Sequence, residues 1–304
     1  MYKEKKKPNF FIAGAAKSGT SSLFHYLNDH PQVYMSPVKE PHYLCHHHLP
    51  ETFSGPGDEG FSHGVVRSLP KYEQLFTRVN QESIVGEASV YYLYYPDTAE
   101  RIKEFNPDAK VILILRNPVD RAFSAYLHTV RDGRETLSFE QALREEPRRR
   151  ESGYQPLWWY KEVGLYSSQV QRYLETFDQG HLRIFLYEDF KSTELLLQNV
   201  LSFLRIDTQT EINTSAQHNV SGVPRAKWAY NFFSKPNPVK QILKALMPEK
   251  LAHQLGERAK NMTLQKVTMA ENTRKQLQDY FRSDIQSLQS MIGRDLSSWV
   301  NVTS

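Results

Sequence analysis

Short apolar runs alternate along the chain with segments in which apolar residues recur every three to four positions. The runs predict strands at 9–13, 32–35, 83–85, 110–115 and 182–186. The periodic segments predict amphipathic helices after Thr20 and at 118–129, 168–177 and 193–204. Because strands and helices alternate, we predict an α/β fold: a single domain with a central parallel sheet flanked by helices.

The last third of the chain is predicted to be mainly helical. Apolar side chains at helical spacing face a core there: Leu277, Tyr280, Phe281, Leu288 and Ile292. Ahead of this helix, the polar stretch 213–237 is interrupted by glycine and proline, which predicts one long loop or two loops. Long loops are often functional.

Length and composition are those of an ordinary globular protein. The 304 residues are 39% hydrophobic and 24% charged, and we predict a flexible basic tail at 1–8 followed by one domain at 9–304. The longest purely aliphatic run, Val111–Leu115, is too short to cross a bilayer, so no membrane span is expected. The N-terminus resembles no leader, which favours a cytoplasmic protein provided that no leader has been removed.

The net charge and the cysteine content limit the kinds of ligand and the cellular compartment that the sequence favours. A net charge of +4 fits an anionic small molecule better than nucleic acid, which usually requires a concentrated basic face. The single cysteine, Cys45, excludes an intrachain disulfide and fits a reducing compartment. Three histidines follow it at 46–48, but adjacent residues rarely converge on one ion, so no metal site is predicted.

The segment Gly14–Thr20 joins a predicted strand to a predicted helix. Backbone N–H groups and the positive end of a helix surround phosphates at such junctions. In the common nucleoside triphosphatase loop a lysine follows the second glycine, whereas here Lys17 precedes Gly19. The segment therefore predicts a phosphate loop and disfavours a kinase or ATPase.

This segment carries a resemblance to a known family. Phe10–Leu23 resembles the 5'-phosphosulfate loop of the sulfotransferases, particularly the heparan sulfate enzymes and their bacterial relatives. The resemblance implies 3'-phosphoadenosine 5'-phosphosulfate (PAPS) as the sulfuryl donor. It also implies that Lys17 contacts the oxygen between phosphorus and sulfur, and that the 5'-phosphate is held by Ser18, Gly19, Thr20 and Ser21.

A second block, Val111–Ser124, resembles the 3'-phosphate motif of that family. The resemblance implies that Arg116 and Ser124 hold the phosphate. An arginine offers it a planar fork of donors and a serine on the following helix adds a hydroxyl. Arg121 is an alternative ligand, although a structural pairing is favoured for it.

Later segments resemble further landmarks of the family, so the resemblance covers nearly the whole chain: Gly164–Tyr166, Leu182–Phe190 and Leu296–Trp299. The stretch Asn219–Arg225 resembles the loop that closes over the nucleotide. By that resemblance Gly222 and Arg225 are candidate contacts of the 3'-phosphate.

Lys39–Tyr43 resembles the Glu-x-His-aromatic segment of the heparan sulfate branch, which implies that Glu40 is the general base, with His42 as second choice. Without the resemblance, Glu40 would be read as a surface ion pair with Lys39. Some carbohydrate sulfotransferases carry a lysine where this chain has Ala88, so Lys17 or Lys39 is left to supply positive charge.

These observations predict an enzyme that transfers a sulfuryl group from PAPS, without a metal, to a hydroxyl or amine acceptor. The acceptor stays open among a carbohydrate, a lipid, a small metabolite and an acyl chain tethered to a carrier protein. The alternatives from other classes are a nucleotide kinase and a non-catalytic nucleotide-binding protein.

Overall fold

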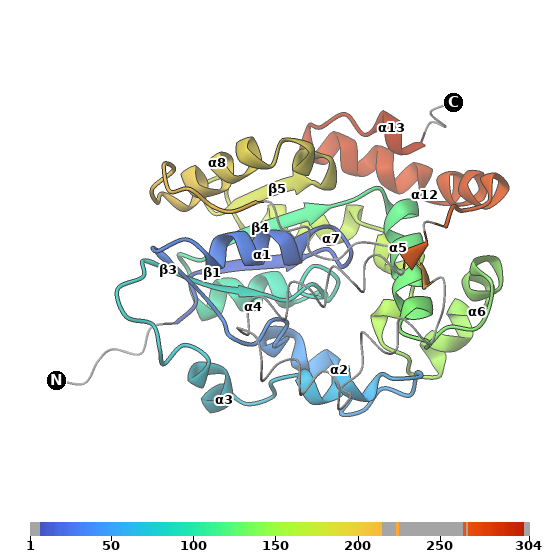
Figure 1. Ribbon diagram of the computed structural model, residues 1–304, viewed down its shortest axis with the longest axis horizontal. Helices are drawn as coiled ribbons and strands as arrows, with labels where there is room; N and C mark the ends of the chain where they lie inside the picture. The colour runs from blue at the N-terminus through green and yellow to red at the C-terminus, as the bar shows by residue number, and fades with distance from the viewer. Residues whose placement is uncertain (1–6, 215–222, 225–263, 266, 301–304) are drawn as a thin grey trace, which may run out of the picture.

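The computed structural model describes residues 7–214, 223–224, 264–265 and 267–300 of the chain. Its centre is a five-stranded parallel sheet in the order β2–β3–β1–β4–β5 (Figure 1). The strands are β1 Phe10–Gly14, β2 Val33–Met35, β3 Ile84–Ala88, β4 Lys110–Leu115 and β5 Leu182–Leu186. Each lies on or within a few residues of a predicted strand, and the predicted α/β domain with a central parallel sheet is confirmed.

Strand β1 lies in the middle of the sheet, paired with β3 on one side and β4 on the other. Its side chains alternate between the faces: Phe10 and Ile12 pack into one hydrophobic cluster and Phe11 into the other. All three are fully buried. Both faces therefore lie against apolar side chains, which explains why this strand reads as an unbroken apolar run.

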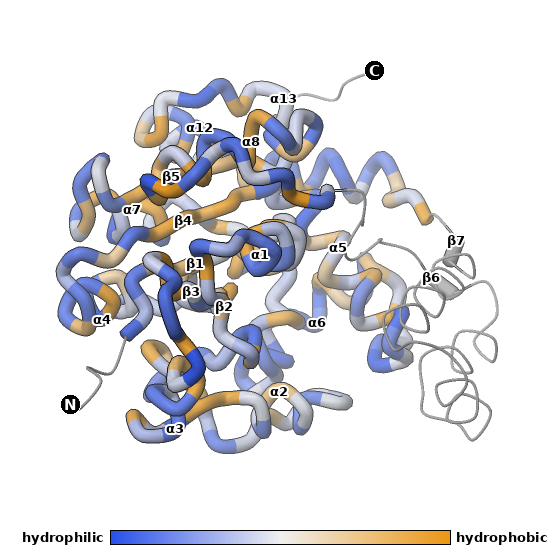
Figure 2. Tube along the Cα trace, turned by 60° about the vertical axis from the view of Figure 1, so that its left-hand side comes forward, coloured by the Kyte–Doolittle hydropathy of each residue, from blue (hydrophilic) through white to orange (hydrophobic). Residues whose placement is uncertain are grey.

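Helices cover both faces of the sheet. One face packs against α1 Thr20–Asn28 and α8 Thr193–Leu204, and the other packs against α4 Thr98–Phe105, α5 Pro118–Arg131, α7 Ser167–Thr176 and α12 Glu271–Ile292. Figure 2 shows the hydrophobic residues concentrated on the central strands, with hydrophilic residues on the outer helices. Burial of these apolar surfaces is the main stabilising contribution to the fold.

Besides α4, several elements were not predicted. They are α2 Glu59–Gly64, α3 Leu69–Gln74, α6 Phe139–Glu151, α13 Ser297–Val300, the antiparallel pair β6 Val223–Pro224 and β7 Leu264–Gln265, and the 3-10 helices η1 Tyr43–His48, η2 Pro156–Trp158, η3 Glu162–Gly164 and η4 Tyr187–Ser192. Because helix α6 is highly charged, the sequence feature that marks it is the capping box at its N-terminus. The Ser138 hydroxyl accepts from the Gln141 N–H and the Gln141 side chain accepts from the Ser138 N–H.

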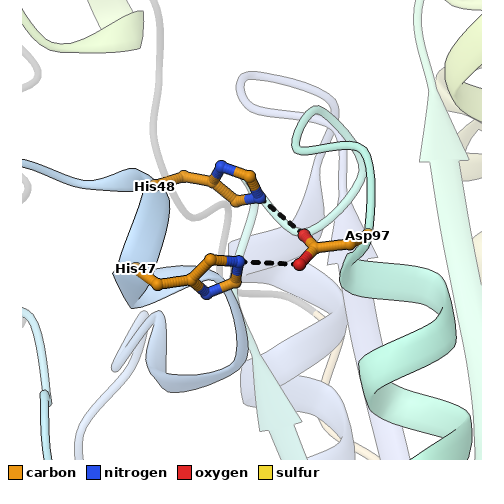
Figure 3. Close-up of side chains that lie close together, drawn as sticks. All are labelled: His47, His48 and Asp97. Atoms are coloured by element: carbon orange, nitrogen blue, oxygen red, sulfur yellow. Dashed lines mark hydrogen bonds and ion pairs between the residues drawn. The ribbon is translucent and has the colours of Figure 1, made fainter.

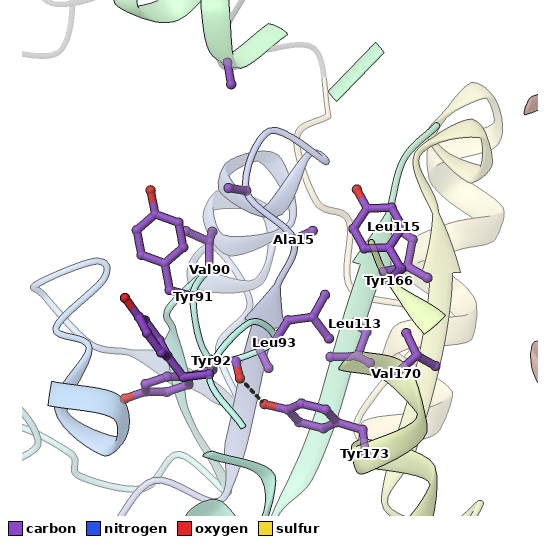
Figure 4. Packing of buried hydrophobic residues seen from close by; sticks show 14 of the residues in the cluster. Ala15, Val90, Tyr91, Tyr92, Leu93, Leu113, Leu115, Tyr166, Val170 and Tyr173 are labelled. Atoms are coloured by element: carbon purple, nitrogen blue, oxygen red, sulfur yellow. Dashed lines mark hydrogen bonds between the residues drawn. The ribbon is translucent and has the colours of Figure 1, made fainter. Parts of the chain in front are cut away.

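The segment that follows β3 is tied to the end of β1. The Leu93 N–H donates to the Ala13 carbonyl over 2.7 Å, and the Tyr173 hydroxyl on α7 donates to the Tyr92 carbonyl over 2.8 Å (Figure 4). A Cβ atom on Gly14 would lie 2.6 Å from the Cβ of Leu93, so the close approach requires glycine there. These contacts bring Val90 and Tyr91 to the end of β1.

Within the described ranges, no helix combines the length and apolar character that a membrane crossing needs. The basic tail, apart from residues 7 and 8, lies outside the described residues, as does the predicted loop 213–237 apart from 213–214 and 223–224.

Candidate functional site

A cavity of about 830 Å³ opens where the carboxyl ends of the five strands meet. The segment after each strand contributes a lining residue: Lys17 after β1, Glu40 after β2, Tyr91 after β3, Arg116 after β4 and Glu188 after β5. Ligands of open parallel sheets bind at this edge, because the loops that leave the strands converge there.

The loop between β1 and α1 has an unusual backbone. Lys17 has a φ of 69° and Gly19 a φ of 92°, both in the left-handed region. At Gly19 a Cβ atom would come within 2.8 Å of the Phe190 ring, so this position requires glycine for conformation and for space. Helix α1 starts at Thr20, and its first turn lines the cavity with the positive end of the helix dipole.

Lys17 lies beside His128, a residue of α5. Its Nζ is 3.2 Å from His128 Nδ1. Burial, with a contribution from the nearby Arg131, lowers the pKa of Lys17 to about 7. Lys17 is therefore a cation whose charge is poorly compensated at neutral pH, and an anion in the cavity would stabilise its protonated form.

His128 is held in its neutral form. Burial, and then the charges of Lys17 and Arg131, lower the pKa of its imidazole far below the ordinary range. Its Nδ1 also accepts from the Arg131 guanidinium over 2.7 Å, while its Nε2 lies 3.4 Å from Asp132. The neutral ring therefore serves two cations as a common acceptor and keeps them next to each other.

Arg116 fastens the phosphate loop to the end of β4. Its Nη1 donates to the Lys17 carbonyl over 3.0 Å, and its guanidinium lies 4.4 Å from the centre of the Tyr187 ring. Lys191 and Arg134 also line the cavity. This concentration of positive charge suits a ligand with more than one anionic group.

Glu40 lines the cavity with its carboxylate between two basic residues. It forms an ion pair with Lys39, and its Oε2 lies 3.5 Å from His42 Nε2. Burial alone would raise the pKa of Glu40, but Lys39 and His42 more than offset that effect and hold the pKa well below its ordinary value. The carboxylate is therefore ionised at neutral pH.

His42 is buried beneath Glu40 and does not line the cavity. Its imidazole stacks on the Tyr91 ring at 5.2 Å. Both Glu40 and His42 have positive φ values, 63° and 52°. With this backbone conformation the His42 imidazole lies inside the protein while the Glu40 carboxylate reaches the cavity.

The buried carboxyl group of Glu87, on β3, is connected by hydrogen bonds to the segment that holds Glu40 and His42. It accepts hydrogen bonds from Ser89, over 2.6 Å, and from the hydroxyls of Tyr72 and Tyr92. Ser89 Oγ in turn accepts from the His42 N–H over 3.0 Å. Burial raises the pKa of Glu87 to about 7 although all three hydroxyls lower it.

The structure brings most of the predicted site residues to one cavity: Lys17, Gly19, Thr20, Ser21, Glu40, Arg116 and Ser124. Ser18 and His42 are buried and do not line it. Arg121 is also buried and donates to the Tyr160 carbonyl, as expected for a structural pairing. Gly222 and Arg225 lie outside the described residues, and the ligands of each residue remain predictions.

Other residues of the cavity were not assigned roles from the sequence: His128, Arg134, Gln155, Tyr187, Phe190 and Lys191. His128 lies on α5, Arg134 follows α5 and Gln155 directly precedes η2, all far in the chain from the phosphate loop. Tyr187 and Phe190 belong to a segment that was singled out only as a landmark. Two aromatic residues shortly after a predicted strand were the sequence feature that could have indicated them as site residues.

Comparison with known proteins gives one family. The profile of the sulfotransferase domain matches residues 7–291. A sulfotransferase from Alicyclobacillus acidocaldarius has a solved structure that covers 97% of this chain, and this chain covers all of that one, with 39% identity and a TM-score of 0.79.

Two curated relatives are more distant. The membrane-associated sulfotransferase kil1 of Dictyostelium discoideum is 32% identical over 145 residues, which are 46% of this chain and 28% of that protein. The heparan sulfate glucosamine 3-O-sulfotransferase 3A1 of Mus musculus is 25% identical over 292 residues, which are 96% of this chain and 64% of that protein. The chain thus spans less than two thirds of the length of either relative.

The contact between Gly19 and Phe190 generates a first prediction. The Gly19→Ala variant should lower the free energy of unfolding by about 2 kcal/mol or more, because it adds backbone strain and a steric clash. Gly133→Ala is the matched control: Gly133 has a φ of 72°, but nothing lies within 4 Å of its added Cβ. Urea unfolding that shows equal losses in the two variants would contradict a clash with Phe190.

The buried Glu87 generates a second prediction. Since its folded pKa of about 7 exceeds the ordinary 4.5, its ionisation destabilises the folded protein as pH rises from 4.5 to 7. The Glu87→Gln variant should therefore gain stability relative to wild type over this interval, by on the order of 3 kcal/mol. Urea unfolding measured at several pH values checks this.

The control for this measurement is Glu135→Gln. Although burial opposes it, Arg149 holds the pKa of Glu135 below its ordinary value. Its ionised form therefore stabilises the folded protein. The variant should lose stability relative to wild type as pH rises toward 4.5 and show no further change between 4.5 and 7. Equal pH profiles for wild type and Glu87→Gln would show that Glu87 does not titrate as described.

Proposed function

This chain belongs to the sulfotransferase domain family, and we propose that it transfers a sulfuryl group from PAPS to a hydroxyl or amine, with Glu40 as general base. The observation that carries the proposal is that the ionised Glu40 and the cationic Lys17 line one cavity. In-line transfer needs a base on the acceptor side of the sulfur and positive charge on the leaving side.

The residues of the cavity fit a bisphosphorylated nucleotide. The phosphate loop, with Lys17 and the first turn of α1, would hold the 5'-phosphosulfate, and Arg116 with Ser124 would hold the 3'-phosphate. Arg116 supports this placement because it already joins the two motifs through its bond to the Lys17 carbonyl. Charged hydrogen bonds of this kind are the strongest available to a phosphate.

The transfer is an in-line displacement at sulfur. The acceptor oxygen or nitrogen forms a bond to sulfur while the bond from sulfur to the phosphate oxygen breaks, and its electron pair stays on that oxygen. The acceptor proton passes to Glu40. Lys17 stabilises the charge on the leaving oxygen, and the low pKa of free Lys17 means that this charge is gained as the anion binds.

Two features near Glu40 support its role rather than that of His42. Glu40 reaches the cavity, whereas His42 is buried and stacked on Tyr91. We assign His42 a positioning role: it restrains the Glu40 carboxylate, and its backbone is restrained by Ser89. Lys39 pairs with Oε1 of Glu40, and Oε2 of Glu40 is the oxygen that lies close to His42.

For the acceptor we propose a carbohydrate first. The supporting observation is the similarity of this chain to the heparan sulfate glucosamine 3-O-sulfotransferase 3A1 of Mus musculus. Tyr91, Phe61, Arg134 and Gln155 also line the cavity, a combination of rings and hydrogen-bonding groups that suits sugars. A lipid, a small metabolite and a carrier-tethered acyl chain are the other acceptor classes to be tested.

The low pKa of Lys17 predicts how nucleotide binding depends on pH. Below about 7 Lys17 is already charged, but at higher pH it must take up a proton when the anion binds. The affinity for 3'-phosphoadenosine 5'-phosphate should therefore fall as pH rises from about 7, with measurable proton uptake. Calorimetry in two buffers of different ionisation enthalpy checks this.

The comparison variant for this experiment is Lys17→Met. It should bind the bisphosphate more weakly at pH 7 by about 2 kcal/mol, and with a flatter pH dependence. An unchanged slope in this variant would contradict the assignment to Lys17. Thermal stabilisation by magnesium ATP and not by the bisphosphate would overturn the proposed donor and favour a kinase.

The base assignment predicts a loss of turnover without a loss of nucleotide affinity. Glu40→Gln should lower kcat roughly 10²–10⁴-fold, because the amide cannot take the acceptor proton. The assay is transfer of labelled sulfate from PAPS to a panel that holds a polysaccharide, a phenol, a long-chain alcohol and a carrier-tethered hydroxyacyl chain.

Glu188→Gln is the matched control. Glu188 lines the same cavity and accepts a hydrogen bond from Trp299. The glutamine of the variant can still accept this bond, while the cavity loses one negative charge. Its kcat should change far less than that of Glu40→Gln. Full activity of Glu40→Gln would sink the base assignment and leave the donor assignment standing.

A further inference from the structure

Outside the cavity, two adjacent histidines face a carboxylate from another element. His47 and His48 end η1, and Asp97 immediately precedes α4. His47 Nε2 lies 2.7 Å from one oxygen of Asp97 and His48 Nε2 lies 2.6 Å from the other (Figure 3). The ligand atoms of all three residues lie within 4.8 Å of one another.

This convergence is not imposed by the local backbone. Consecutive side chains of a 3-10 helix point about 120° apart, yet the two imidazole rings lie with centres 4.1 Å apart and turn toward one carboxylate. His48 is also fixed from behind, because its ring stacks on Tyr95 at 4.9 Å. The rings are thus oriented before any ligand binds.

Asp97 is likewise directed at the histidines. It occupies the position before the first turn of α4, where an aspartate side chain usually accepts from a helix N–H, but it makes no such bond. Its two oxygens are instead shared between the two imidazoles. Both elements therefore present their donor atoms to a common point.

We propose that His47, His48 and Asp97 bind a divalent transition-metal ion, with zinc(II) the best match, at a site separate from the sulfuryl-transfer cavity. None of the three lines that cavity. Two imidazoles and one carboxylate are ligands that zinc prefers, and three protein ligands leave a fourth position for water. His47 is partly exposed, with 35% of its side chain accessible, so an ion has a path to the site.

The geometry needs only a small adjustment. Zinc bonds of about 2.0–2.2 Å to nitrogen and oxygen place tetrahedral ligand atoms roughly 3.3 Å apart. Each imidazole Nε2 would thus move from its Asp97 oxygen by about 0.6–0.7 Å and exchange its proton for the metal.

The sequence prediction of no metal rested on the four adjacent residues 45–48, and two of these contact groups other than Asp97. Cys45 is buried with its Sγ 3.5 Å from the His42 carbonyl, and His46 Nδ1 contacts the Tyr43 carbonyl. The third ligand comes from residue 97, which the spacing of the adjacent residues did not indicate. The proposed site thus departs from that prediction.

Calorimetric titration with zinc chloride tests the proposal. The protein is used after removal of any polyhistidine tag and after dialysis against a chelator. One equivalent of zinc should bind, with a rise in melting temperature, and cobalt(II) should give the visible absorption of a low-coordinate site. His48→Ala and Asp97→Ala should each weaken binding roughly tenfold or more.

His46→Ala is the matched control, since it removes a histidine from the same 3-10 helix without touching Asp97. It should bind zinc as wild type does. Absence of saturable binding to wild type, or equal affinity in wild type and both ligand variants, would overturn the site. If a ligand variant shows altered circular dichroism, His48→Gln replaces it, since the amide keeps a hydrogen bond to Asp97.

Discussion

The main-chain hydrogen bonds that hold β1 between β3 and β4 place the centre of the candidate site. They bring the loop after β1 next to the ends of both neighbours, and Ala15 and Leu93 extend this pairing beyond the strands themselves. Lys17, Tyr91 and Arg116 are therefore neighbours although nearly a hundred residues separate the first from the last. A change in strand order would separate them.

The electrostatics of the cavity follow from this crowding. Burial, with the nearby charges of Arg131 and Arg116, lowers the pKa of Lys17, and the neutral His128 keeps Lys17 and Arg131 together by accepting from both. Such a site is poised for anions because a bound phosphate removes the repulsion among the cations. The proposed donor supplies this charge at both ends of the nucleotide.

The proposed base depends on a second, buried layer. Glu87 holds Ser89 and Tyr92, and their hydroxyls accept from the backbone of the segment that follows Glu40. The same segment continues into η1, which ends at the His47–His48 pair. The position of Glu40 is thus restrained by hydrogen bonds beneath it and by contacts of η1 with the start of α4.

Local patterns in the sequence determined the strands, most of the longer helices and the kind of phosphate loop, because each depends on residues within a few positions of one another. The place of Lys17 before Gly19 is an example. Tertiary structure alone decided that His128 meets Lys17, that Ser18 and His42 turn inward, and that Asp97 meets two histidines. These contacts depend on strand order and on positive φ values, which no short-range pattern of apolar and polar residues specifies.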